Sequence, residues 1–401
     1  MNMEKLFRYT IRELNKEKSK LIIFILFFVL VWRAALELVY IFLTPIITSN
    51  LPISSGLGWL HWDGNWYYSI VTTGYHYVAN NLIYQNVPFF PGFPFLTWIL
   101  HTITDLTASY SGLLLNLLLS IGIGIIAYEL WGLFSANTKY KSINKQTFLP
   151  LALVFFLPTS FFFAAYYSEA LTVFSLILGI YFAYKKKYYL AAFMAGLATT
   201  SNPIGVVLAP ALLVLYLQQK NFFHAFSLKK CINVVTLSIL SVWGILSYML
   251  FLDLRFNQPI AFYLDEKAWG RSGNLITKLM SIPYNHFFDM HYFSYTARVF
   301  YLIALTDMLV PIIAFAMIVY LIYKKVWWLV VYVVFSIGLP LSTGQIGSIN
   351  RFSLVLIPVL IYIIAQIKPS LHKYVWVLLA ISATIEIILT AVFLQGSFFV
   401  G

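Results

Sequence analysis

The chain has 401 residues, of which 61% are apolar, 18% aromatic and only 10% charged, and its mean hydropathy is +0.83. This composition excludes an ordinary soluble globular protein. The formal charge of +12 does not indicate nucleic-acid binding, because the basic residues are spread over short segments between apolar runs. We therefore predict an all-α polytopic integral membrane protein, since a helix satisfies its own backbone groups in hydrocarbon.

Apolar runs near the 20 residues that a bilayer core requires predict about eleven transmembrane helices. These runs lie near 20–47, 108–134, 147–166, 168–184, 188–201, 204–219, 231–252, 297–323, 326–341, 352–367 and 374–395. The pair on either side of Ser201-Asn202-Pro203 is short, which predicts a broken pair that reaches the outer surface. No internal repeat is evident, so residues 1–401 are interpreted as a single membrane domain.

The basic residues predict the orientation of these helices. The N-terminus through Lys20 and the segments 139–145, 185–187, 220–230, 324–325 and 368–373 hold 19 of the 26 Lys and Arg residues. The positive-inside rule makes these segments cytoplasmic, including residues 1–19. Two long segments, 48–107 and 253–296, then face outward and form an interfacial loop region.

The first outward segment contains a predicted interfacial helix from Gly64 to about Thr73, ended by Gly74. Its apolar side chains share one helical face and its polar side chains share the other. The apolar set is Trp62, Trp66, Tyr67, Ile70 and Val71, and the polar set is Asn65, Ser69 and Thr72.

Asp63 opens this helix within His61-Trp62-Asp63-Gly64 and has two interpretations. Its carboxylate is suited to capping the free amides of the first helical turn. A carboxylate at the level of the lipid headgroups is also suited to accept a proton from an attacking hydroxyl. The two roles are compatible.

Other charged residues are placed at the outward ends of helices. Glu169 follows Ser168 at the start of an apolar run, where it meets the positive end of the helix dipole and Ser168 is a candidate cap. Arg271 and Arg351 are candidate ligands for phosphate, although an arginine at a helix end also anchors the helix to headgroups. Arg33 and Glu37, four residues apart in the first apolar run, are expected to neutralise one another.

Several types of site are not indicated by the sequence. The histidines have no metal-ligand spacing, and Asp63-Gly64-Asn65 lacks the second carboxylate of an Asp-x-Asp motif. No required metal or other cofactor is therefore predicted. There is no phosphate-binding loop of the ATPase type, no nucleophile elbow and no dinucleotide fingerprint. The single cysteine, Cys231, excludes an intrachain disulfide.

Taken in order, a set of motifs resembles the PIG-V-like mannosyltransferases, which include the second mannosyltransferase of GPI-anchor assembly and its prokaryotic relatives. The resemblance runs through most of the chain, and all its pieces fall on the predicted outward side. The pieces are Trp62-Asp63, Gly74-Tyr75, Phe89-Phe90-Pro91, Tyr167-Ser168-Glu169, Gly196-Leu197-Ala198-Thr199, Pro259-Ile260-Ala261-Phe262, Trp269-Gly270-Arg271 and Arg351-Phe352.

The resemblance implies a GT-C glycosyltransferase fold and transfer of a hexose, with mannose expected, from a polyprenyl-phosphate sugar to a lipid-linked or membrane-presented acceptor. Asp63 would be the general base. Residues implied in binding the donor phosphate or the substrates are His61, Glu169, Asn202, Gln258, Trp269, Arg271 and Arg351. The compact length is similar to that of a prokaryotic member, which implies a plasma membrane with the active site on its extracytoplasmic side.

One position departs from the family pattern. Where relatives usually carry an arginine, this chain has Asn202 before Pro203. The departure puts recognition of the donor phosphate by this segment in question.

The alternative is a lipid or sugar transporter or flippase, supported by the broken helices and by embedded charges such as Asp307. A transporter would gather its polar groups near the middle of the bilayer, whereas here they gather at the outer edge. A non-catalytic membrane subunit is a third interpretation.

Overall fold

The computed structural model describes residues 3–47, 58–80, 83–136, 148–220, 227–269, 295–342 and 348–396. Regular structure within these ranges is helical throughout, and no strand occurs in them. The longer helices are α1 (Met3–Leu38), α3 (Asp63–Thr73), α4 (Gly92–Thr104), α5 (Ala108–Ala136), α7 (Glu169–Tyr184), α8 (Tyr188–Thr199), α9 (Leu208–Gln219), α10 (Leu228–Leu240), α11 (Trp243–Phe256), α14 (Tyr295–Tyr323), α15 (Trp327–Ser342) and α18 (His372–Leu394). The prediction of an all-α chain is confirmed.

Shorter helical pieces connect these helices. They are a π-helical stretch at Val39–Leu43, α2 (Thr44–Ile47), α6 (Phe148–Phe155), α12 (Ala261–Asp265), α16 (Ile349–Phe352), α17 (Ile357–Ala365) and the 3-10 turns Ser160–Phe163, Pro203–Val207, Ser353–Leu356 and Pro369–Leu371.

Four helical stretches in the described ranges are long and apolar enough to cross a membrane: Lys18–Ile46, Ala108–Ala136, Leu305–Tyr323 and Pro369–Leu394. A fifth is added if α10 and α11, which bend by 57° at their junction, are counted as one span. Five further apolar stretches have 10–17 residues, shorter than a bilayer core requires for a straight crossing. The count of eleven spans remains a prediction.

Large apolar side chains on the outside of the bundle fit this membrane interpretation. Phe27 of α1, Phe315 of α14 and Leu378 of α18 are each about two thirds exposed. Exposed apolar side chains on this scale are unfavourable in water and suited to lipid.

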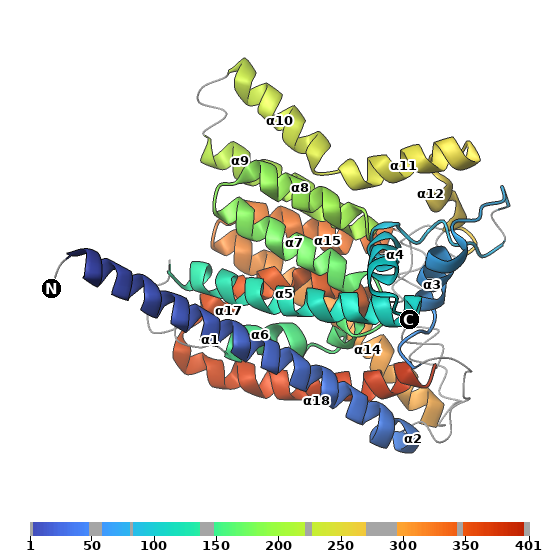
Figure 1. The fold of residues 1–401 in the computed structure, drawn as a ribbon, viewed down its shortest axis with the longest axis horizontal. Coiled ribbons are helices and arrows are strands. Elements are labelled where there is room, and N and C mark those ends of the chain that lie inside the picture. Colours follow the sequence, from blue (N-terminus) through green and yellow to red (C-terminus); the bar gives the residue numbers. More distant parts are fainter. Residues whose placement is uncertain are drawn as a thin grey trace.

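The bundle has two distinct ends (Figure 1). The N-terminus lies at one end of the view, and α3, α4 and α12 gather at the other end. The helix α7 starts near α3 and runs away from it, packed against α5 and α8. The short turn 185–187 between α7 and α8 therefore lies at the end opposite α3.

The segment 48–107, which is predicted to face outward, contains α3 as expected. The helix spans Asp63–Thr73, and Gly74, with φ +81°, donates its amide to the Ile70 carbonyl and ends it. Tyr67 and Ile70 are buried, whereas Thr72 is exposed, so the predicted amphipathic face is confirmed. The helix α4 was not predicted, because its Pro-rich start was interpreted as part of a loop.

Two predicted spans are interrupted. In the run 147–166, α6 ends at Phe155, shortly before Pro158, and an irregular buried segment follows. In the run 231–252, the chain bends between α10 and α11, where the Thr199 hydroxyl of α8 accepts the Ile245 amide at 3.1 Å. A side chain from another helix thus satisfies a first-turn amide that a continuous helix would have used internally.

Candidate functional site

Three charged side chains from distant parts of the chain meet beside α3. Arg351 donates from Nη1 to Asp63 Oδ2 at 2.6 Å, and its Nε lies 3.1 Å from Glu169 Oε1. Asp63 is the first residue of α3, Glu169 is the first residue of α7, and Arg351 lies on the short helix α16. We name this group the carboxylate–arginine cluster.

The three members differ in their access to solvent. The side chains of Arg351 and Glu169 are 5% and 7% exposed, whereas that of Asp63 is 19% exposed. The guanidinium is thus enclosed together with Glu169, and Asp63 is the most exposed member of the cluster.

Aromatic rings and a polar loop hold Arg351 in place. Its guanidinium carbon lies 5.1–5.6 Å from the ring centres of Phe162, Tyr167 and Phe352, within the range of cation–π attraction. Asp307 of α14 accepts the Asn350 amide at 2.9 Å, directly before the arginine. The position of Arg351 is therefore set by buried neighbours on both sides.

Asn350 makes two further hydrogen bonds to buried residues. Its side-chain amide donates to the Thr306 hydroxyl at 3.0 Å, and its carbonyl accepts the Thr159 hydroxyl at 3.0 Å. Thr306, Thr159 and Asn350 are all buried. Such a bonded buried network is suited to fixing one arrangement of the α16 segment.

Asp63 is oriented by a strained turn. Trp62 precedes it with φ +51°, a conformation that residues with a Cβ rarely adopt. The Tyr167 hydroxyl donates to the His61 carbonyl at 3.1 Å, and the Tyr166 amide donates to the Trp59 carbonyl at 3.0 Å. These bonds tie the start of α3 to the segment that precedes α7.

That preceding segment is irregular and buried, so its backbone needs partners outside a helix. Asn116 of α5 donates from its side-chain amide to the carbonyls of Ala165 and Tyr167. The hydroxyls of Tyr67 and Ser168 share a hydrogen bond of 2.8 Å. Together these contacts bring the starts of α3 and α7 to the same place.

The capping interpretations of Asp63 and Ser168 are wrong. Trp62 occupies the N-cap position of α3 without a side-chain cap bond, and the Asp63 carboxylate binds Arg351. Ser168 occupies the cap position of α7 without a side-chain cap bond, because its hydroxyl is used by Tyr67. Glu169 does lie in the first turn of α7, as the dipole argument predicted.

The structure supplies a role for Arg351 that the sequence did not predict. The guanidinium of Arg351 is already paired with two carboxylates, which neutralise its positive charge. The cluster carries a formal charge of −1 when both acids are ionised. Binding of a donor phosphate by Arg351 would need the arginine to leave one carboxylate. Its phosphate role remains a prediction.

Asn202 lies at the edge of the same cluster but in a structural role. A cavity of about 10 Å³, room for roughly one water, is lined by Asn202 together with Glu169 and Arg351. The Asn202 side-chain oxygen accepts the Ile204 amide at 3.1 Å and caps the following turn. The residue that departs from the family pattern therefore borders the cluster.

The remaining predicted site residues lie in other surroundings. His61 is buried, its Nε2 lies 3.3 Å from the Leu394 carbonyl, and burial lowers the pKa of its imidazole. Trp269 packs edge-on against Trp66 of α3 and against Tyr84, with ring centres 5.8 and 4.7 Å apart. The Gln258 carbonyl accepts the Ala261 amide at the start of α12.

Arg271 lies outside the described residues. The pair formed by Arg33 and Glu37, in contrast, is confirmed, with a distance of 2.7 Å between Nη2 and Oε1. Arg33 also donates to the Ala164 carbonyl at 2.8 Å. Both residues thus have a structural explanation.

Sequence reasoning missed the residues that support Arg351, namely Asp307, Asn350 and Thr306. From the sequence, Asp307 is predicted only to be an embedded charge. The sequence offers one signal for this support. The run Gly347-Ser348-Ile349-Asn350 before Arg351 has polar residues that fit a capped turn. Across the described ranges, no three His, Cys, Asp or Glu side chains gather closely enough to hold a metal ion.

No protein-family model and no curated protein matches the chain. Evidence for its function therefore comes from the residues and their geometry.

Proposed function

We propose that the chain is a membrane glycosyltransferase that moves a hexose from a polyprenyl-phosphate sugar to a lipid-linked or membrane-presented acceptor. The observation that carries the proposal is the carboxylate–arginine cluster, in which Asp63 is the accessible acid. Three segments of the motif set that resembles the PIG-V-like family, 62–63, 167–169 and 351–352, contribute to this one site.

The proposed step is a displacement at the anomeric carbon of the donor. The acceptor oxygen forms the new bond, the bond from the anomeric carbon to the phosphate oxygen breaks, and polyprenyl phosphate leaves with the electron pair. The Asp63 carboxylate takes the proton of the attacking hydroxyl. Inversion at the anomeric carbon follows from this single displacement.

Arg351 acts as a positioning residue in this proposal. It binds one oxygen of Asp63 and leaves the other to face the acceptor, so the base is held in one rotamer. Glu169 shares the guanidinium from the buried side. Contacts to the donor phosphate are assigned to Arg271, or to Arg351 after it exchanges a partner.

The proposal also includes a GT-C fold, about eleven spans, a cytoplasmic N-terminus and an extracytoplasmic site. The chain would lie in a prokaryotic plasma membrane. Support comes from the charge pattern and from the location of the cluster at the end of the bundle opposite the turn 185–187.

The test is a product assay on the purified full chain. The protein is incubated with a small panel of polyprenyl-phosphate hexoses and membrane lipid extract, with and without a chelator, and products are identified by mass. We expect one donor to give a product heavier than its acceptor by one hexose, at a rate that the chelator leaves unchanged. Absence of product with every donor would contradict the proposal. A loss of activity in the chelator that a divalent ion restores would contradict only the prediction that the reaction needs no metal.

A transporter or flippase remains the second candidate, because α10 and α11 form a bent pair of the kind that lines transport sites. Reconstituted vesicles distinguish the two functions. Movement of a labelled polyprenyl-phosphate sugar across the bilayer without any glycosylated product would favour the transporter.

A further inference from the structure

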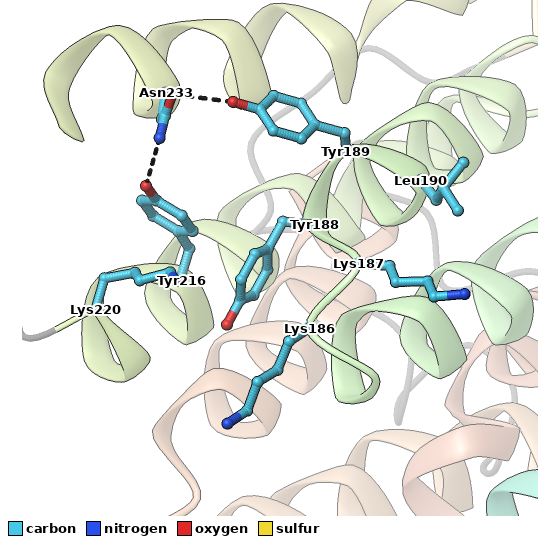
Figure 2. Close-up of a pocket in the computed structure, with 8 residues that line it drawn as sticks. All are labelled: Lys186, Lys187, Tyr188, Tyr189, Leu190, Tyr216, Lys220 and Asn233. Atoms are coloured by element: carbon cyan, nitrogen blue, oxygen red, sulfur yellow. Dashed lines mark hydrogen bonds between the residues drawn. The ribbon is translucent and has the colours of Figure 1, made fainter. Parts of the chain in front are cut away.

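A second site lies at the end of the bundle opposite α3. It is a pocket of about 350 Å³ between the turn that starts α8, the last turn of α9 and the side of α10 (Figure 2). Its lining residues are Lys186, Lys187, Tyr188, Tyr189, Leu190, Tyr216, Lys220 and Asn233. This volume is within the range of small-molecule sites.

A chain of hydrogen bonds holds the walls of this pocket, which we name the lysine–tyrosine pocket. The Tyr189 hydroxyl donates to Asn233 Oδ1 at 2.9 Å, and Asn233 Nδ2 donates to the Tyr216 hydroxyl at 3.0 Å (Figure 2). The Tyr216 hydroxyl is the acceptor in that bond, so its hydrogen is available to a ligand. Three helices are thereby connected around one opening.

The positive charge of the pocket has no acidic partner within it. In Figure 2, Lys186 and Lys220 lie on either side of Tyr188, whereas Lys187 points away from them. None of the eight lining residues is acidic. The lysine side chains thus carry charge that a bound anion would neutralise.

Two further features favour an anion. The helix α8 starts at Tyr188 without a side-chain cap bond, so its first amides and the positive end of its dipole face this region. Lys220 Nζ lies 5.9 Å from the ring centre of Tyr188, which keeps this ammonium group over the pocket wall.

An apolar surface adjoins the pocket. Along α8, Tyr189, Leu190 and Phe193 are each 42–51% exposed. An exposed apolar strip next to ammonium groups suits a molecule with a phosphate at one end and acyl chains at the other.

We propose that the lysine–tyrosine pocket binds a phosphate group, and that an anionic phospholipid presents it. Lys186 and Lys220 pair with the phosphate oxygens, and the Tyr216 hydroxyl donates to one of them. The acyl chains lie along the exposed face of α8. This site is independent of the glycosyl transfer assigned to Asp63.

The experiment measures binding to the purified full chain in a non-ionic detergent by native mass spectrometry. The probes are dioctanoyl phosphatidic acid, dioctanoyl phosphatidylcholine and inorganic phosphate. The test variant is Lys186→Gln with Lys220→Gln. The control is Lys324→Gln with Lys325→Gln, which makes the same charge change in the turn between α14 and α15, outside the pocket.

The wild type is expected to bind phosphatidic acid more tightly than the other two probes. The test variant should lose about tenfold or more in affinity for phosphatidic acid, whereas the control should retain its affinity. Equal losses in both variants, or no loss in the test variant, would overturn the site. Inorganic phosphate bound as tightly as phosphatidic acid would overturn the lipid source and assign the pocket to a soluble phosphate compound.

Discussion

At one end of the bundle Arg351 is enclosed by two carboxylates and three aromatic rings, whereas at the other end Lys186 and Lys220 border an open pocket that has no acidic lining residue. The first arrangement fixes a cation against two acids, and in the proposed function it orients Asp63 as the base. The second leaves cations available to a ligand. In this molecule, exposure and partners, rather than charge itself, decide whether a basic residue is structural or available to a ligand.

The largest expected effect on stability is at the enclosed arginine. Arg351→Ala leaves Asp63 and Glu169 close together without their cation, which should cost about 3–5 kcal/mol of unfolding free energy. Arg33→Ala is the matched control, because Arg33 also pairs with an acid but the side chain of Glu37 is 41% exposed. Denaturant unfolding of the purified variants measures both.

A double variant tests whether the stability losses at Arg351 and Glu169 are coupled. Adding Glu169→Gln to Arg351→Ala removes part of the uncompensated charge, so the combined loss should be smaller than the sum of the single losses. Additive losses, or equal costs for Arg351→Ala and Arg33→Ala, would contradict the account of an enclosed cluster.

A smaller effect is expected at Gly92, which anchors α4 to the turn after α8. Its amide donates to the Thr200 carbonyl at 2.6 Å, and a Cβ at this position would lie 2.3 Å from Thr200 Oγ1. Gly92→Ala should therefore cost about 1–3 kcal/mol. Gly132→Ala in α5 is the control, since a Cβ there would meet nothing within 4 Å. Equal stability of the two variants in thermal unfolding would argue against this close approach.

Parts of this end of the molecule were predictable from the sequence. The period of apolar residues predicted α3, and Gly74 predicted its end, because both are local signals. The spacing of Arg33 and Glu37 predicted their ion pair for the same reason.

The long-range contacts were not predictable in this way. The orientation argument predicted that Asp63 and Arg351 share one side, but their direct contact joins residues 288 positions apart. The irregular segment after α6 is bonded from another helix, since the Asn116 side chain of α5 donates to the carbonyls of Ala165 and Tyr167. Such partners belong to tertiary packing, which overrides the apolar pattern of a single segment.

A pH effect is expected at His61, near the start of α3. Burial lowers the pKa of the folded imidazole below its ordinary value of 6.5, so the folded state binds fewer protons than the unfolded state there. The contribution to stability is present above pH 6.5 and is lost as the pH falls toward the folded pKa. His61→Gln should flatten this decline, measured as unfolding free energy between pH 5 and 8. The exposed His76→Gln is the control, and an unchanged decline in His61→Gln would contradict the assignment.

The smallest effect is expected at the lysine end. Lys186→Gln with Lys220→Gln should change the unfolding free energy by no more than about 0.5 kcal/mol, because no carboxylate among the lining residues loses a partner. A loss as large as that of Arg351→Ala would show that these lysines are structural and would remove the contrast between the two ends.

Asp63 is proposed to be the base, and this role is tested by the rate of hexose transfer by Asp63→Asn at saturating donor. The control is Asp105→Asn, the same change in the same segment, 48–107, at the end of α4, where the residue has φ +57° and asparagine is well tolerated. We predict a transfer rate at least about 100-fold below wild type for Asp63→Asn, with the folded state and donor binding retained, and a rate near wild type for Asp105→Asn. Wild-type transfer by Asp63→Asn would contradict the account.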